Sequence, residues 1–155
     1  MIVRVVLAAA LLVPLCAQPA RPAPAAIATN GTGTAVEPRF ETAWTDLSSA
    51  LWMLTHSDAV SAKDPHYQQA VHALYGAIGA MDDGITDSRH RSTTPTAARD
   101  GHVRLHAALN FLTAADRLLA PPSGDKNAEP LRARALMRTR EALTATKALV
   151  AACRC

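Results

Sequence analysis

Apolar residues recur at intervals of three and four positions along four stretches of the chain, a spacing typical of amphipathic α-helices. The sequence predicts these helices at residues 38–56, from residue 64 to a stop at Gly84, and at 94–120 and 128–152. A proline lies at or near the start of each, where its missing N–H breaks no helical hydrogen bond. No stretch with the alternation of a β-strand competes with them.

Four such helices predict an all-α domain in which each helix buries its apolar face against the others. Connections of modest length favour antiparallel neighbours. We therefore expect an antiparallel up-down-up-down four-helix bundle over residues 37–155, with a signal peptide and a disordered linker before it.

Two features on the predicted outer faces indicate contact surfaces. Trp52 falls on the polar side of the first helix, where it either contacts a partner or lies flat over its neighbours. Ala73, Gly76 and Ala80 form a stripe of small residues on the outside of the second helix. Such a stripe lets another helix approach closely, so it suggests a homodimer seam, the alternative being an alanine-rich surface without a partner.

The N-terminus has the layout of a secretory signal peptide over residues 1–17, with Arg4 followed by an apolar run and small residues. Cleavage as late as residue 25 also fits. The run is shorter than the roughly 20 residues that span a bilayer, so no stable membrane anchor is expected. Residues 18–36, rich in Ala, Pro and Thr, predict a disordered linker. The expected location is extracytoplasmic, either secreted or periplasmic.

Cys16 raises the alternative of a lipoprotein, but Leu15 stands before it where such signals usually carry Gly, Ala or Ser. Removal of the signal peptide leaves Cys153 and Cys155, which are too close in sequence to staple a fold. The core must therefore come from apolar packing.

Composition narrows the function classes only a little. A chain of 155 residues with 49% hydrophobic residues suffices for one domain. The formal net charge of +3 falls when Arg4, and with late cleavage Arg21, leaves, so nucleic acid is not an expected partner. No catalytic motif such as GxSxG or a phosphate-binding glycine loop is present, so we do not predict an enzyme.

Histidine and cysteine residues offer a possible metal site. His102 and His106 stand at i and i+4, a spacing that presents two imidazoles to one ion, and Cys153 and Cys155 add thiols. In an up-down-up-down bundle one pole would gather these residues with Asp82, Asp83 and His90. Zinc or copper is the implied ion. A b-type haem held by His102 and Met81 is a weaker alternative, and the chain lacks the CxxCH motif of a c-type haem.

One ion pair is expected to fix the register of the bundle. Asp116 falls on the apolar face of the third helix and Arg132 within the apolar stripe of the fourth. A buried carboxylate is costly without a partner, so we expect Asp116 to pair with Arg132.

The sequence thus favours an exported helical bundle that acts by binding, either to a protein partner or to itself. The alternative is an extracytoplasmic bundle that binds a transition metal through His102, His106, Cys153 and Cys155.

Overall fold

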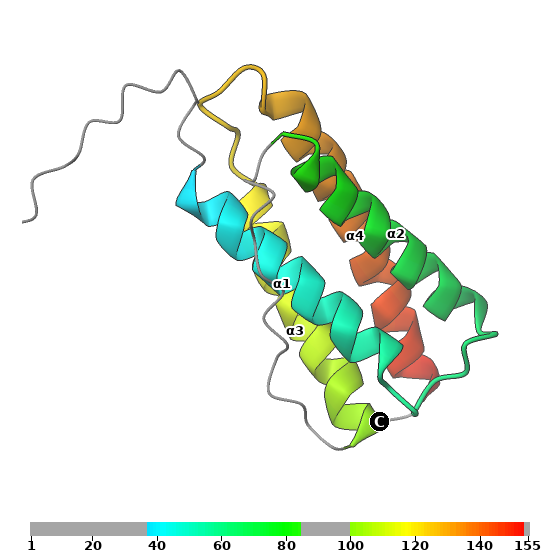
Figure 1. The fold of residues 1–155 in the computed structure, drawn as a ribbon. Helices are drawn as coiled ribbons and strands as arrows, with labels where there is room; N and C mark the ends of the chain where they lie inside the picture. Colours follow the sequence, from blue (N-terminus) through cyan, green and yellow to red (C-terminus); the bar gives the residue numbers. More distant parts are fainter. Residues whose placement is uncertain (1–36, 85–99, 154–155) are drawn as a thin grey trace, which may run out of the picture. The chain divides into compact units, whose positions relative to one another are not determined.

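The computed structural model describes residues 37–84 and 100–153, which form four α-helices and contain no strand. They are α1 (Pro38–Thr55), α2 (Pro65–Asp82), α3 (Gly101–Leu119) and α4 (Glu129–Ala152), shown in Figure 1. The predicted all-α class is confirmed. The expected signal peptide and linker lie outside the described residues.

Two of the four helices, α2 and α3, begin with an aspartate cap. Asp64 precedes α2, and its carboxylate accepts hydrogen bonds from the backbone N–H groups of His66 and Tyr67. Asp100 does the same for His102 at the start of α3, and its backbone is extended. α3 therefore begins at Gly101 and not at the predicted residue 94, and residues 94–99 lie outside the described residues.

The helices form a four-membered ring in the order α1, α2, α4, α3. α2 packs chiefly on α4 and α1 on α3, and the ring is closed by the α3–α4 and α1–α2 seams. The core cluster draws apolar side chains from all four helices. α1 and α4 therefore face each other across a diagonal.

The direction of α3 overturns the predicted up-down-up-down order. Arg39, at the start of α1, donates to the carbonyls of Pro121 and Pro122 just after α3. Ser57, just after α1, donates to the carbonyl of Gly101 at the start of α3. These contacts make α1 and α3 antiparallel. In Figure 1 α2 and α3 accordingly run one way, and α1 and α4 the other.

The small residues of α2 lie inside the bundle. Ala73 is 2% and Ala80 3% exposed, and Gly76 lies against the side chain of Arg138 from α4. The homodimer seam predicted on this stripe is therefore wrong, because the stripe already packs within the chain. Tyr75, on the same helix, is 60% exposed. α2 thus places its alanines in the core together with Leu74 and Met81, and small residues allow the close approach of a neighbouring helix.

Two arginines close the C-terminal end of α3, where helical carbonyls lack intrahelical partners. Arg132 is 8% exposed and donates to the carbonyl of Leu119 at 2.6 Å. Glu129 holds the same guanidinium through its carboxylate. From α1, Arg39 reaches the next carbonyls of the chain, as described above. We call Arg39 and Arg132, with their carboxylate partners Glu37 and Glu129, the arginine clamp.

The predicted ion pair between Asp116 and Arg132 is wrong, because Arg132 belongs to the arginine clamp. Asp116 instead pairs with Arg140, whose Nε lies 2.8 Å from the Asp116 carboxylate. Arg132 turns to the open carbonyls at the end of α3 and to Glu129, one turn earlier on its own helix.

The clamp predicts a loss of stability in acid. Hydrogen bonds from Arg132, and from the backbone N–H of Ser123, lower the pKa of the Glu129 carboxyl to about 2. Because this pKa is depressed in the folded protein, its stabilising contribution is full above the unfolded-state pKa near 4.5 and is lost as the pH falls toward 2. In urea titrations, the stability difference between the wild type and Glu129→Gln should therefore be largest at neutral pH and vanish near pH 2. A difference independent of pH would contradict this assignment.

The buried hydroxyl of Thr146 is a site where a substitution should stabilise the protein. Thr146 is fully buried, and its Oγ1 has no hydrogen-bond partner among the described residues. Thr146→Val removes this unsatisfied group at nearly constant volume, so we expect a gain of about 1 kcal/mol in the free energy of unfolding. The matched control is Thr139→Val, because the equally buried Thr139 hydroxyl donates to the carbonyl of Ala135. Urea denaturation should show no such gain for the control, and equal effects would contradict the argument.

Candidate functional site

The residues of the predicted metal pole are divided between the two ends of the bundle. Cys153 is half-buried, and its thiol contacts the carbonyl of Ala59 at the end where α3 begins, near His102. Asp82 lies at the opposite end, bonded to Trp44 in the first half of α1. The predicted gathering of Asp82 with His102 and Cys153 is therefore wrong, because α3 runs in the other direction.

The histidines of α3 do not join a ligand cluster within the described part of the chain. His102 and His106 are both exposed, and no group of three or more His, Cys, Asp or Glu residues is placed to hold an ion in residues 37–84 and 100–153. His90 and Cys155 lie outside these residues.

The seam between α1 and α2 opens into a groove of about 340 Å³. Trp44, Leu51 and Trp52 contribute from α1, and Tyr75 and Ile78 from α2. Ser48 and Thr55 complete the lining. Both tryptophans and one of the two tyrosines of the whole chain therefore meet at this surface. We call it the aromatic groove.

Neighbouring groups hold the rings of the groove in place. The indole of Trp52 stacks on the imidazole of His56 with a centroid separation of 4.2 Å and an interplanar angle of 13°. His56 Nδ1 lies 2.9 Å from the carbonyl oxygen of Trp52. At the other end, the indole Nε1 of Trp44 donates to the carboxylate of Asp82 at 2.8 Å. Both indoles of the groove are therefore held by neighbouring groups, which reduces the entropy lost when a ligand binds.

Sequence reasoning found one part of this groove and missed the rest. Trp52 was singled out as a surface residue, and it is half-buried at the groove. Trp44, Leu51 and Tyr75 also line the groove, and the sequence did not single them out. The signal was present in the spacing of residues 44, 48, 51, 52 and 55, which follow one edge of a helix. The sequence did not indicate that α2 turns Tyr75 toward that edge of α1.

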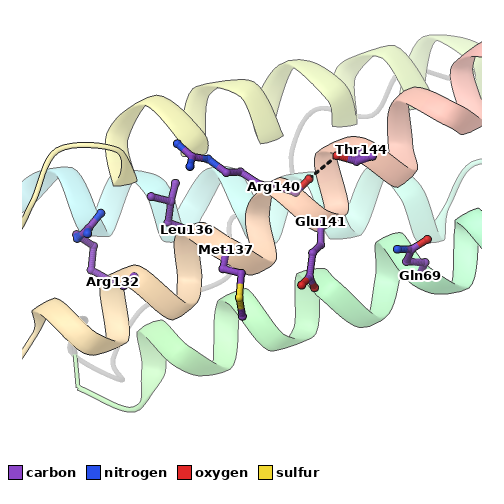
Figure 2. Close-up of a pocket in the computed structure, with 8 residues that line it drawn as sticks. Gln69, Arg132, Leu136, Met137, Arg140, Glu141 and Thr144 are labelled. Carbon is purple, nitrogen blue, oxygen red and sulfur yellow. Dashed lines mark hydrogen bonds between the residues drawn. The ribbon is translucent and has the colours of Figure 1, made fainter.

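A second hollow of about 500 Å³ runs along the outer face of α4. Figure 2 shows Leu136 and Met137 in its middle, with Arg140 and Glu141 pointing to opposite sides of the helix. Met137 is 50% exposed. Arg140 pairs with Asp116 and Glu141 with Arg138, so their charges are already compensated within the chain. This face offers the aliphatic side chains of Leu136 and Met137 and no ring, whereas the aromatic groove offers three rings.

Comparison of the chain with protein-family models, curated proteins and solved structures found no match. The fold and site therefore define the class of protein only as an all-α four-helix bundle. None of the described helices has the length and apolar character needed to cross a membrane.

Proposed function

We propose that this bundle is a binding protein that receives an apolar segment of a partner protein in the aromatic groove. The observation that carries the proposal is the meeting of Trp44, Trp52 and Tyr75 around one hollow. Trp and Tyr are enriched at binding hot spots because each ring buries a large area with few rotatable bonds. Tyr75, at 60% exposed, is the most exposed of the large hydrophobic side chains in the described residues.

The lining favours a side chain of a protein over a sugar as the occupant. A sugar needs several hydrogen-bonding groups beside the ring on which it stacks. Here the hydroxyl of Thr55 already donates to backbone carbonyls of its own helix. The other lining residues of the groove are aromatic or aliphatic except Ser48. Its volume of about 340 Å³ is at the lower end of the range for ligand pockets and suits a few apolar side chains of a docked helix.

The proposed function includes the compartment in which the partner is bound. The signal peptide expected over residues 1–17 would deliver the bundle to an extracytoplasmic compartment, where the partner would be met. Binding without catalysis is the activity we propose, since the groove lining combines rings, aliphatic groups and hydroxyls.

The test is a selection with a phage-displayed library of helical peptides that carry leucines at i, i+3, i+4 and i+7. The protein should enrich peptides whose affinity falls at least about tenfold in Tyr75→Ala and in Trp52→Ala, the size expected when a hot-spot ring is truncated. Calorimetry with individual synthetic peptides measures this change.

The matched control is Met137→Ala, which truncates a similarly exposed apolar side chain on α4. Its affinity should equal that of the wild type. Circular dichroism confirms that each variant is folded. Peptides that bind all the variants equally, or a selection without enrichment, would contradict the proposed function.

A further inference from the structure

We infer that the partner segment is cationic as well as apolar, with a lysine or arginine that binds the carboxylate of Asp82 at one end of the aromatic groove. This inference rests on the proposed function and adds the charge of the partner to it.

The first observation is the position of the Asp82 carboxylate. One oxygen accepts the hydrogen bond from the Trp44 indole, and the side chain has no cationic partner among the described residues. The indole N–H therefore fixes the carboxylate beside an aromatic wall of the groove. Since a carboxylate has about four acceptor sites, this hydrogen bond leaves Asp82 able to bind a further donor.

The second observation is the absence of competing cations on the two helices that form the groove. α2 contains no lysine or arginine, and the only one in α1 is Arg39. Arg39 is occupied by Glu37 and by the carbonyls that follow α3. Lys63 lies in the connection between α1 and α2, at the other end of the groove from Asp82. No lysine or arginine of α1 or α2 is therefore placed to neutralise the Asp82 carboxylate at the end of the groove.

The scarcity of lysine and arginine is specific to α1 and α2. The single helix α4 contains five such residues, Arg132, Arg134, Arg138, Arg140 and Lys147. A surface with aromatic faces and an available carboxylate attracts an ammonium or guanidinium through the ring quadrupole as well as the negative charge. An acidic segment would meet like charge at Asp82 without a compensating cation.

The test uses the leucine-patterned peptide library with its variable positions drawn equally from Lys, Gln and Glu. Groove-dependent binders, defined by loss of binding to Tyr75→Ala, should be enriched in Lys and depleted in Glu. The affinity of the best synthetic peptide should fall roughly fivefold in Asp82→Asn, which removes the charge and retains an oxygen that accepts from Trp44. Glu141→Gln on α4 is the matched control and should bind as the wild type does.

The outcomes separate this inference from the proposed function. Groove-dependent peptides with equal Lys and Glu content, or equal affinity for the wild type and Asp82→Asn, would overturn the cationic partner and leave the groove as a binding site. A selection without groove-dependent peptides would overturn the proposed function itself. Sedimentation of the protein alone should show a monomer. A dimer that Tyr75→Ala dissociates would assign the groove to a second copy of the chain and also overturn the inference.

Discussion

Replacing Gly101 with alanine is expected to destabilise the protein by about 3 kcal/mol, at the upper end of the usual cost of overpacking. Gly101 opens α3 directly against the turn that follows α1. A Cβ at this position would lie 2.7 Å from the backbone nitrogen of Ala59 and closer still to the carboxylate of Asp58. The side chain of Asp58 can rotate away, but the backbone of Ala59 can move only if the end of α1 shifts.

Urea denaturation followed by circular dichroism measures this effect, and Gly79→Ala is the control. Gly79 lies in α2, where an added Cβ meets no atom within 4 Å. Because alanine has the higher helix propensity, the control should gain up to about 1 kcal/mol. Equal midpoints for the two variants would contradict the close approach of α3 to the end of α1, and with it the antiparallel arrangement of these two helices.

Replacing Arg132 with leucine is expected to cost about 3 kcal/mol. The substitution leaves the buried carbonyl of Leu119 without its donor, and such a group costs about 1–3 kcal/mol. It also removes the partner of the Glu129 carboxylate. The apolar area of leucine does not offset these losses, because the guanidinium donates to Glu129 through Nε and Nη2 and to the Leu119 carbonyl through Nη1.

Thermal unfolding of Arg132→Leu should show a much larger fall in Tm than that of Arg134→Leu, two residues further along α4. Arg134 is exposed and makes no hydrogen bond or ion pair within the described residues. Similar falls for the two variants would mean that the arginine clamp does not stabilise the end of α3.

The helices could be predicted from sequence because their apolar spacing and capping residues are local. The core faces of α1 and α3 followed the same spacing, and Leu105, Leu112 and Leu119 are buried as the pattern predicts. The core face of α2 was harder to predict, because this helix has one face of large apolar residues and another of small residues. Its alanines joined Leu74 and Met81 in the core, because small side chains permit close packing on α4, and this choice depends on the partner helix.

The direction of α3 could not be predicted from the sequence, for a geometric reason. Residues 83–100 separate α2 from α3, and a connection of that length can extend about 55 Å. α3 itself is about 28 Å long, so the chain can begin it at either end of the bundle. The mistaken direction of α3 explains the mistaken metal pole, because both followed from the same assumption. The Asp116–Arg132 pair was wrong for another reason, since helical patterns do not indicate that an arginine will cap a neighbouring helix.

The candidate groove combines two helices whose relative rotation the sequence does not specify. Trp52 could be found because it departs from the apolar face of α1. Its meeting with Tyr75 required the observed rotation of α2, and the attachment of Asp82 to Trp44 required the antiparallel α1–α2 seam. The site is therefore a property of the packed bundle.

Tryptophan fluorescence tests the central claim most directly, because both tryptophans of the chain line the aromatic groove. A groove-selected peptide without aromatic residues is titrated into the protein while the emission spectrum is recorded. The account predicts a shift of the emission maximum to shorter wavelength, as the indoles lose water, with a midpoint equal to the Kd measured by calorimetry. Saturated binding with an unchanged tryptophan spectrum would contradict it, since the peptide would then occupy another surface of the bundle.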